Sequence, residues 1–341
     1  MKKVNHLNQI EICVTSVCNL HCKHCYQALS KNKYVLDYDL VKSVIDYGVQ
    51  HGCQTFVLSG GEYFTYPYAY ELLDYIIDKT KANITCITNS LLLDITKITE
   101  YPNERLNFKI SIDGNEIEHD KRRGAGTYQS TKSKIKYLRN LGYKVGITMT
   151  LANDNWYTLA EILESSDYDD ITLMPVANTG DATKHYSQQT DTVEYKELIS
   201  HIYNQCREYR DEKHRCTIFP NGLSVNFDGS IYPCTLARDY GLMKIGNIYT
   251  QNINAEIDAY LESDDSNVLF EYKNNGQIIV CNECTMNYTC TRGCRIRALK
   301  WNGNLLTPDP FACKLFSGLY DDITYGDIYW GKHPHSNKKL P

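Results

Sequence analysis

Short runs of apolar residues alternate with longer amphipathic stretches from residue 9 to about residue 177. This alternation is typical of repeated βα units built around a parallel sheet. It predicts six strands, at residues 9–15, 54–59, 83–88, 107–112, 144–151 and 170–176. Six units are fewer than the eight of a closed barrel, so we expect an open, partial (β/α)6 TIM-like barrel whose gap admits something larger than a metabolite.

Residues 38–50 have the clearest helical pattern of the amphipathic stretches. One face of this predicted helix is apolar, and Gly52 follows it as a residue suited to ending a helix. Pro67 suits the first turn of the next helix. The residues of the apolar face are Leu40, Val41, Val44, Ile45 and Tyr47.

The pattern changes after the predicted barrel, which we assign to residues 1–190. Residues 191–215 are predicted to form a bridging helix, residues 216–315 a cysteine-rich domain, and residues 316–341 a C-terminal helix or tail. Two short strand-like runs in the cysteine-rich domain flank Asp228 and Gly229, a pair well suited to a type I′ hairpin turn. The chain is therefore expected to be an α/β protein with a cysteine-rich appendage.

Composition excludes several classes of partner. Lys and Arg total 36 against 41 Asp and Glu, and no basic block stands out, so we expect neither nucleic acid nor a membrane as partner. No apolar run approaches the ~18 residues of a membrane span, and residues 1–12 lack the apolar core of a signal peptide. We expect a cytoplasmic protein, in which 14 cysteines indicate metal binding rather than disulfides.

Three cysteines lie close together just after the first predicted strand. Cys18, Cys22 and Cys25 have the spacing C-x3-C-x2-C, one ligand short of the four that a cubane iron–sulfur cluster needs. A cluster held by three thiolates leaves one iron open to a small molecule. The alternative is a zinc site. Other polar or glycine-rich segments also follow predicted strands, where ligands of parallel sheets gather.

The segment C18-N-L-H-C22-K-H-C25 resembles the cluster loop of the radical SAM enzymes. In that family the open iron chelates S-adenosylmethionine, and one-electron reduction yields a 5′-deoxyadenosyl radical that abstracts a hydrogen atom. The resemblance implies that Gly60 and Gly61 let the backbone approach the methionyl group of S-adenosylmethionine. It also implies that the forked guanidinium group of an arginine binds the carboxylate of that cofactor. The cofactor contacts that it implies are His24, Gly60, Gly61, Glu62, Asn89, Ser111, Asp113 and Arg123.

Two positions depart from the pattern of that family. His24 stands where an aromatic ring usually lies near the adenine, and Tyr63 follows Glu62 where proline is common. Histidine is planar and can substitute for the aromatic ring. Neither change removes a cluster ligand.

The second region resembles the SPASM extension of that family, which holds two auxiliary iron–sulfur clusters, giving three [4Fe-4S] clusters in all. The resemblance assigns Cys281, Cys284, Cys290 and Cys313 to one cluster. It assigns Cys216, Cys234 and Cys294 to the other, for which Cys206 is either an eighth ligand, a buried helix residue or a hydrogen-atom donor. A zinc ribbon using four of these cysteines is the alternative. Packing is the expected role of Cys13, Cys53 and Cys86.

The resemblance implies maturation of a ribosomally made precursor peptide through an oxidative thioether or carbon–carbon cross-link. The alternatives are peptide epimerisation, sulfatase maturation, oxidation of a small molecule, or a non-enzymatic electron carrier. Sulfatase-maturing relatives carry an acid where this chain has Thr235, although Asp239 is a nearby candidate. We expect His119, Asp120 and His185 to be structural or solvated rather than acid–base groups.

The resemblance also implies partners. The first predicted strand begins about nine residues into the sequence, and we therefore expect no N-terminal leader-binding domain. A leader-bearing precursor peptide would then need a separate leader-binding protein or the open face of the barrel. An external electron donor of the flavodoxin or ferredoxin type would reduce the cluster.

Overall fold

The structure of the chain is a computed structural model. It describes residues 7–25, 32–152, 154–176, 181–186, 218–264, 266–267, 269, 281, 283–284, 293–310 and 312–313. The chain divides into two compact units, which we describe separately. The first unit comprises Met1–His185 and Thr217–Ser263, and the second comprises Tyr186–Cys216 and Asp264–Pro341. The predicted bridging helix at 191–215 and tail at 316–341 lie outside the described residues.

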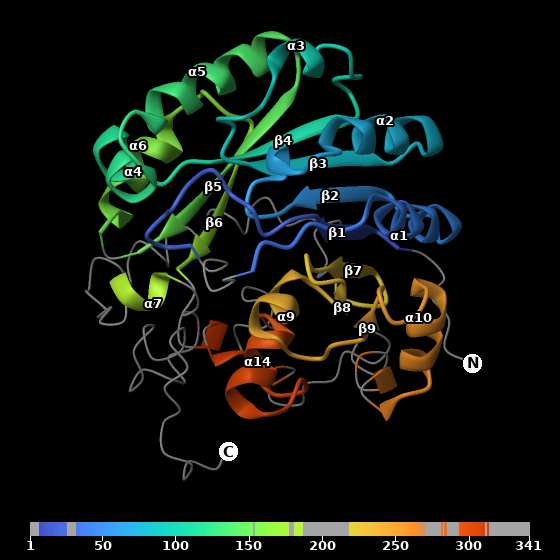
Figure 1. Cartoon of the computed structure of the whole chain (residues 1–341). Helices are drawn as coiled ribbons and strands as arrows, with labels where there is room; N and C mark the ends of the chain where they lie inside the picture. Colours follow the sequence, from blue (N-terminus) through green and yellow to red (C-terminus); the bar gives the residue numbers. More distant parts are fainter. Residues whose placement is uncertain are drawn as a thin grey trace. The chain divides into compact units, whose positions relative to one another are not determined.

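A nine-stranded sheet forms the centre of the first unit, in the order β6-β5-β4-β3-β2-β1-β7-β8-β9 (Figure 1). Its first six strands are parallel and confirm the six predicted from the sequence. The sheet is open, so the barrel is partial, as predicted. The six strands are β1 (Gln9–Cys13), β2 (Thr55–Ser59), β3 (Asn83–Thr88), β4 (Leu106–Ser111), β5 (Lys144–Leu151) and β6 (Asp170–Pro175).

Three further strands extend the sheet beyond β1. Strand β7 (Gly222–Val225) pairs parallel with β1, whereas β8 (Ser230–Tyr232) and β9 (Gly246–Asn247) continue antiparallel. The segment that the sequence analysis placed at the start of a separate cysteine-rich domain thus belongs to the same compact unit as the barrel. The predicted hairpin is confirmed as the β7–β8 pair.

The predicted turn type of this hairpin was wrong. A type I′ turn needs positive φ at both central residues, but only Gly229 has it, at φ 79°. The amide of Gly229 instead donates to Asn226 O at 2.8 Å, which closes a turn through Phe227 and Asp228. The carboxylate of Asp228 accepts from Ser230 N at 3.0 Å, so Asp228 stabilises the loop without the strained backbone that was predicted for it.

Helices flank the parallel strands. The predicted helix at 38–50 is confirmed as α1 (Tyr38–Gln50), capped by the Asp37 carboxylate, with Gly52 following at φ 65°. Helix α2 (Ala69–Lys79) begins two residues after Pro67, which therefore precedes the helix rather than lying in its first turn. The other elements of this unit are η1 (Tyr63–Thr65), α3 (Ile95–Ile98), α4 (Glu116–Arg123), α5 (Thr127–Asn140), η2 (Trp156–Thr158), α6 (Leu159–Glu164), α7 (Ala182–His185), α9 (Thr235–Tyr240) and α10 (Ile253–Leu261). Helix α14 (Arg295–Asn302) belongs to the second unit.

The two faces of the parallel sheet differ in polarity. One face is mostly apolar and is buried in β1 to β5, and α1 packs against it, since a Cβ on Gly48 would lie 2.8–2.9 Å from the side chains of Phe56 and Ile10. Alternate residues form the other face, which we call the inner face and which is polar and half-buried in β3, β4 and β5. The inner face of these three strands includes Thr85, Asn107, Lys109, Ser111 and Thr148.

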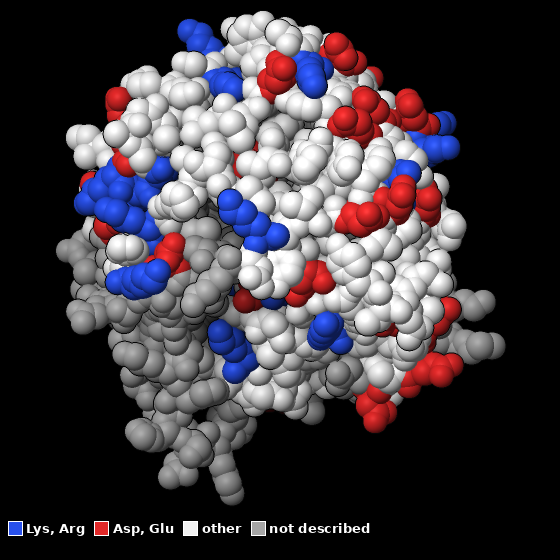
Figure 2. All heavy atoms as spheres, in the orientation of Figure 1, with Lys and Arg blue, Asp and Glu red and all other residues white. Residues whose placement is uncertain are grey.

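Both signs of charge occur on the face of the molecule shown in Figure 2. Acidic side chains gather on the side of α1 and α2, whose sequences include Asp39, Asp46, Glu71, Asp74 and Asp78. Within the described part of the chain, no helix combines the length and the apolarity of a membrane span.

Candidate functional site

The cysteine loop follows β1 directly and is fastened to the end of β2. Gly61 N donates to Thr15 O at 2.7 Å and Glu62 N donates to Val17 O at 2.9 Å. Cys22 is 8% exposed, while Cys18 and Cys25 are half-buried. The loop therefore presents three thiols at the carboxyl edge of the parallel sheet, as the sequence predicted.

Gly60 and Gly61 are required by this fastening. A Cβ on Gly60 would lie 2.7 Å from Thr15 O, and one on Gly61 would lie 2.5 Å from Val17 O. Real Cβ atoms do not approach backbone oxygens so closely. The predicted approach of a cofactor to these glycines stays a prediction, and the structure adds a second reason for them, because the backbone of the cysteine loop lies where their Cβ atoms would be.

We expect Gly61→Ala to displace the cysteine loop. The added methyl group cannot be accommodated without moving Val17, so the free energy of unfolding should fall by about 1–3 kcal/mol, and iron incorporation should fall with it. Urea denaturation and iron analysis after reconstitution measure the two effects. Ser43→Ala on α1 is the control, because it removes only a hydrogen bond to Leu40 O. Normal stability and iron content in Gly61→Ala would contradict this account.

Glu62 joins the end of β2 to the end of β3. Its side chain is 2% exposed and accepts hydrogen bonds from Thr88 Oγ1 at 2.5 Å, Asn89 N at 2.7 Å and Phe64 N at 3.2 Å. Burial raises the pKa of Glu62 against the opposing effect of these hydrogen bonds. The predicted contact between Glu62 and a cofactor stays a prediction, and the structure adds a structural task for this residue.

The end of β3 also reaches the cysteine loop. The side-chain amide of Asn89 donates to Asn19 Oδ1 at 2.8 Å and lies 4.0 Å from Cys18 Sγ. Ser90, the next residue, has φ 67°, an unusual conformation for a residue with a side chain. Ser111 lies half-buried at the end of β4. Asn89 is thus the predicted contact residue at the end of β3 that the structure brings to a cysteine.

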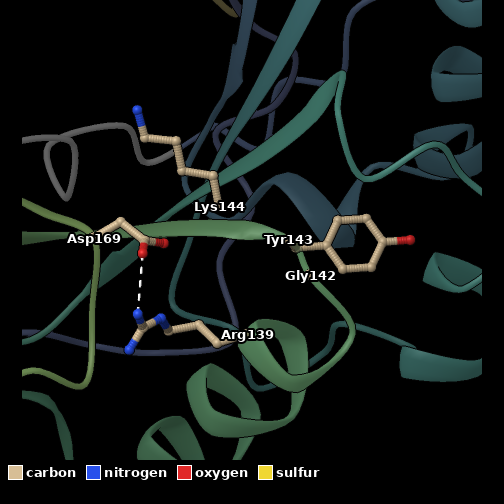
Figure 3. Close-up of a pocket in the computed structure, with 5 residues that line it drawn as sticks. All are labelled: Arg139, Gly142, Tyr143, Lys144 and Asp169. Atoms are coloured by element: carbon tan, nitrogen blue, oxygen red, sulfur yellow. Dashed lines mark hydrogen bonds and ion pairs between the residues drawn. The ribbon is translucent and has the colours of Figure 1, made fainter.

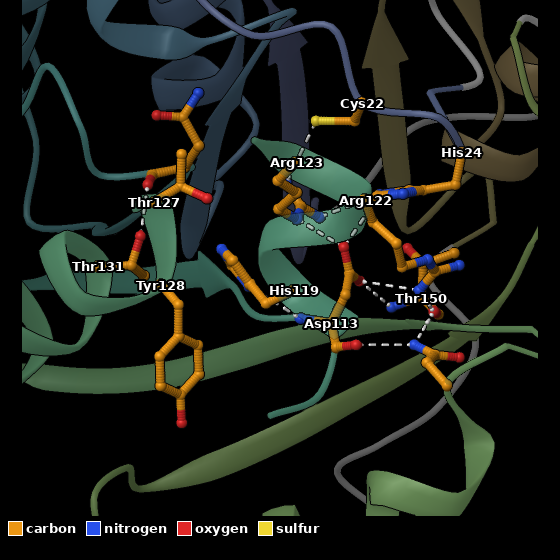
Figure 4. Close-up of polar contacts among 12 residues, drawn as sticks. Cys22, His24, Asp113, His119, Arg122, Arg123, Thr127, Tyr128, Thr131 and Thr150 are labelled. Carbon is orange, nitrogen blue, oxygen red and sulfur yellow. Dashed lines mark hydrogen bonds and ion pairs between the residues drawn. The ribbon is translucent and has the colours of Figure 1, made fainter. Parts of the chain in front are cut away.

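Asp113 is the centre of a buried charged cluster beneath the loop (Figure 4). Its carboxylate is fully buried and accepts from Arg123 Nε at 2.5 Å. Arg122 Nη1 and His24 Nε2 lie 3.7 Å and 3.3 Å from it. Because its oxygens face these side chains and are shielded from solvent, Asp113 holds Arg123 in place, and His24 lies beside the pair. The predicted contact between Asp113 and the cofactor stays a prediction, and the structure adds a positioning role for this residue.

Arg123 extends from Asp113 to the cysteine loop. Its Nη1 lies 3.9 Å from Cys22 Sγ and its Nη2 lies 3.1 Å from His24 Nε2. Burial lowers the pKa of His24 to about 3, against the opposing effect of Asp113, so the imidazole is neutral at physiological pH. Lys23 N donates to Arg122 O at 3.1 Å, which fixes α4 to the loop through the backbone as well.

The thiols of the loop fit a positively charged iron–sulfur group. Burial raises the pKa of Cys18 to about 11 and also raises that of Cys22, against the effect of Arg123, so bare thiols there keep their protons. Iron binding would deprotonate them. Leu20 N donates to Cys18 Sγ at 3.4 Å, and Arg123 Nη1 donates to Cys22 Sγ at 3.9 Å. Hydrogen-bond donors of this kind accompany the sulfur ligands of iron–sulfur clusters. No three His, Cys, Asp or Glu side chains of the described residues are grouped to hold a single metal ion.

Several candidate groups have structural roles. His119 is 1% exposed, and its Nδ1 accepts from Asp113 N at 3.3 Å. Asp120 accepts from Gly126 N and Tyr128 N at the junction of α4 and α5. His185 is exposed on α7. The cysteines expected to pack, Cys13, Cys53 and Cys86, are all buried.

A second buried charged cluster joins β1 to α9 within the first unit. Arg238 Nη1 donates to Glu11 Oε1 at 2.7 Å, and its Nε and Nη2 each lie 3.0 Å from Asp239 Oδ1. Thr235 also donates to Glu11. Burial alone would raise the pKa of Glu11, but Arg238 and the hydrogen bonds outweigh it and hold the pKa low. Burial raises the pKa of Asp239 against the effect of Arg238.

The predicted auxiliary-cluster cysteines are divided between the two units. Cys234 is the N-cap residue of α9 in the first unit. In the second unit, the fully buried Asp309 accepts from Cys294 N at 2.6 Å, and its backbone oxygen accepts from Cys313 N at 2.9 Å. The other described cysteines of the second unit are Cys281 and Cys284, and the predicted ligands Cys206, Cys216 and Cys290 lie outside the described residues.

Sequence reasoning missed Asp309. Its carboxylate is bound by Arg297 Nη2 at 2.7 Å, and a side chain on Gly293 would collide with it. The spacing of the cysteines gave no signal for this residue, which lies between two of them and organises both. The same holds for Glu11, whose partner Arg238 is far away in the sequence.

A separate polar cavity of about 330 Å³ lies at the opposite ends of the strands (Figure 3). Arg139 and Asp169 form an ion pair of 3.1 Å across it. It opens at the amino end of β5, beside Lys144, whereas the cysteine loop lies at the carboxyl ends. This cavity is therefore not part of the candidate site.

Two protein-family models match the sequence. The model of the radical SAM superfamily matches residues 12–165. The model of SPASM, an iron–sulfur cluster-binding domain, matches residues 216–285. The first match includes the cysteine loop, α4 and the strand ends described above, and the second includes β7 to β9.

Two curated proteins show the range of the relatives. AlbA, the antilisterial bacteriocin subtilosin biosynthesis protein of Bacillus subtilis (strain 168), is 29% identical over 156 residues, 44% of this chain and 35% of AlbA. The matched region thus spans about a third of the length of that relative. An AdoMet-dependent heme synthase of Methanosarcina barkeri is 25% identical over 351 residues, 87% of this chain and 94% of the synthase.

A solved structure shares the fold. The crystal structure of Streptococcus suis SuiB bound to the precursor peptide SuiA superposes with a TM-score of 0.68, over 91% of this chain and 76% of SuiB. The sequence identity is 15%, so the similarity concerns the fold. The structural similarity covers 91% of this chain and so extends well beyond the barrel.

Proposed function

Because the chain belongs to the radical SAM superfamily and carries an SPASM iron–sulfur domain, we propose that it modifies a ribosomally made precursor peptide. The proposed reaction abstracts a hydrogen atom from the peptide and then forms a thioether or carbon–carbon cross-link. The chain is an enzyme, so the alternative of a pure electron carrier is set aside. The observation that carries the proposal is the three-cysteine loop with its sulfur-directed donors at the carboxyl edge of an open barrel.

In the proposed site, Cys18, Cys22 and Cys25 hold a [4Fe-4S] cluster. When bound, the cluster supplies the electron that cleaves S-adenosylmethionine and the open iron that chelates it. Asn89 and Arg123 flank the cysteines and are suited to contact the cofactor, and the fork of Arg123 retains N–H groups beyond those it uses for Asp113, Cys22 and His24. The remaining proposed parts of this pocket are His24, Gly60, Gly61, Glu62, the half-buried Ser111 and Asp113.

The inner face of the sheet supports a substrate larger than a metabolite. Side chains that both donate and accept hydrogen bonds line it, as an extended peptide backbone would require. Lys109 of β4 and Asp170 of β6 form an ion pair there across Gly146 of β5, where a Cβ would collide with Asp170. The structural similarity to SuiB with its bound precursor peptide is a second support for a peptide substrate.

We further propose two auxiliary clusters, which with the first make three. Cys281, Cys284, Cys290 and Cys313 would hold one, and Cys216, Cys234 and Cys294 the other, with Cys206 as a further candidate ligand. A separate leader-binding protein and an external electron donor of the flavodoxin or ferredoxin type complete the proposed set of partners.

The test is mass spectrometry of a candidate precursor peptide encoded beside this gene, after anaerobic incubation with reconstituted enzyme, S-adenosylmethionine and reductant. We expect loss of two hydrogens from the peptide, together with 5′-deoxyadenosine. Incubation in deuterated water identifies epimerisation, which adds deuterium without loss of hydrogen. Abundant 5′-deoxyadenosine with every tested peptide unchanged would count against a peptide substrate.

Oxidation of a small molecule is the second candidate function. It is favoured by the match to a heme synthase along 87% of the chain, which exceeds the share matched by AlbA. A tetrapyrrole carrying propionate groups is therefore the small molecule to test in the same assay. Its oxidation, with the peptide unchanged, would replace the peptide proposal.

A further inference from the structure

Arg123 makes three directed contacts in a nearly dry environment. Its side chain is 10% exposed, and its Nε, Nη1 and Nη2 face Asp113, Cys22 and His24 respectively. The carboxylate of Asp113, at 2.5 Å, fixes the plane of the guanidinium group. One N–H edge of that plane then points at Cys22 Sγ, 3.9 Å away (Figure 4).

We propose that Arg123 raises the reduction potential of the iron–sulfur cluster through its N–H contact with Cys22 Sγ, and that Asp113 positions it for this task. The inference rests on the proposed function only in requiring a cluster at Cys18, Cys22 and Cys25. It differs from a role in binding the cofactor, because the contact exists with the cysteine itself.

Charge gives the sign of the effect. One-electron reduction adds a negative charge to a cluster whose thiolate ligands are already negative. A hydrogen-bond donor on a ligand sulfur stabilises the reduced state more than the oxidised state, and hydrogen bonds to sulfur are a known determinant of such potentials. Burial strengthens the interaction, because solvent and salt screen it less than they would at the surface.

The neighbouring arginine shows that the arrangement is specific to one position. Arg122 is also buried, but its Nη1 donates to Thr150 O at 2.6 Å and its Nη2 lies 3.6 Å from Asp154. Arg122 therefore binds the backbone of β5, whereas Arg123 binds the cysteine loop. His24 contributes by accepting from Arg123, which leaves the Nη1 edge directed at Cys22.

The test compares the wild type with Arg123→Met and Arg123→Lys. Arg139→Met is the matched control, because Arg139 pairs with Asp169 at the far ends of the strands. Iron and sulfide analysis first establishes that each protein carries its clusters. A potentiometric titration followed by electron paramagnetic resonance then gives the midpoint potential of the signal that is missing in Cys22→Ala. The titration is carried out without and with S-adenosylmethionine.

Without S-adenosylmethionine, we expect Arg123→Met to have a more negative potential, with about a tenfold lower ratio of reduced to oxidised cluster at a fixed potential, or 59 mV for one electron. Arg123→Lys keeps the positive charge but not the forked guanidinium group. Its midpoint potential should lie between those of Arg123→Met and the wild type. Arg139→Met should titrate as the wild type.

Two results would overturn the proposal. One is a midpoint potential equal to that of the wild type in both Arg123 variants. If Arg123→Met does not retain its cluster, the same result in Arg123→Lys alone overturns the proposal. The other is a shift that arises only with S-adenosylmethionine, which would mean that Arg123 acts through the cofactor. A wild-type protein that takes up no cluster at the loop would instead contradict the proposed function.

Discussion

Cys22→Ala will abolish the formation of 5′-deoxyadenosine from S-adenosylmethionine, down to the background of the reagents. Only two cysteine ligands would remain, so a second iron of the cluster would lack a protein ligand. Arg123 would also lose the sulfur that it faces. The measurement is anaerobic incubation with S-adenosylmethionine and dithionite, followed by chromatography of 5′-deoxyadenosine. We expect lower iron content in the same preparation.

Cys53→Ala is the matched control for this variant. Cys53 is also buried, but it precedes β2 at the end of the sheet remote from the loop, and its thiol faces Thr55 O. It should form 5′-deoxyadenosine at the wild-type rate. Undiminished product from Cys22→Ala would remove Cys22 from the ligand set and with it the three-cysteine site.

Arg238→Met will reduce the free energy of unfolding by about 3–5 kcal/mol near neutral pH, as expected when one partner of a buried ion pair is removed. Glu11 and Arg238 are 6% and 2% exposed, so the carboxylate would remain buried without its cation. Urea denaturation measures the loss. Methionine fills much of the volume of arginine, so a cavity contributes little to it.

The pH dependence identifies the cause of the loss. In the wild type the pKa of Glu11 lies below its ordinary value of 4.5, so its stabilisation is present above that value and is lost as the pH falls. In Arg238→Met the lowering effect of the arginine is lost while burial remains, so the pKa of Glu11 rises and Glu11 takes up a proton as the pH falls. The difference in stability between variant and wild type should therefore shrink between about pH 7 and pH 4.

The double variant Glu11→Gln with Arg238→Met is the control. Removing these two charges should recover the part of the loss that is due to Glu11, since a buried pair replaced by neutral groups is often close to neutral in stability. The part due to Asp239, the other carboxylate that Arg238 contacts, should remain. Arg139→Met, at an exposed ion pair, should change stability by less than about 1 kcal/mol. A loss in Arg238→Met that neither low pH nor the second substitution reduces would show that packing, not charge, is responsible.

The sequence predicted the parallel strands well because their apolar runs are local signals. All six were recognised to within two residues at either end, and α1 was recognised to the residue. The cysteine loop was equally accessible, because its ligands are close together in the chain. The hairpin was found through Asp228 and Gly229, but its turn type depends on φ at each residue, which the dipeptide alone does not determine.

The sequence could not predict contacts made across the sheet. Glu62 was recognised by its motif, yet its three hydrogen bonds depend on how the ends of β2 and β3 are aligned. Arg122 and Arg123 are adjacent, and only the rotation of α4 decides which one faces Cys22. Glu11 and Arg238 are separated by most of the chain and meet because β7 is placed beside β1.

The place of β7 has a consequence for how this protein can be dissected or recombined. Because β1 is hydrogen-bonded to β2 on one side and to β7 on the other, the strand that leads into the cysteine loop is interior to the sheet. A protein truncated before β7 would have β1 as an exposed edge strand, which could pair with strands of other chains. The two matched regions are thus separate in the sequence but share one sheet, and any exchange of the second region between enzymes must carry a strand that fits the first.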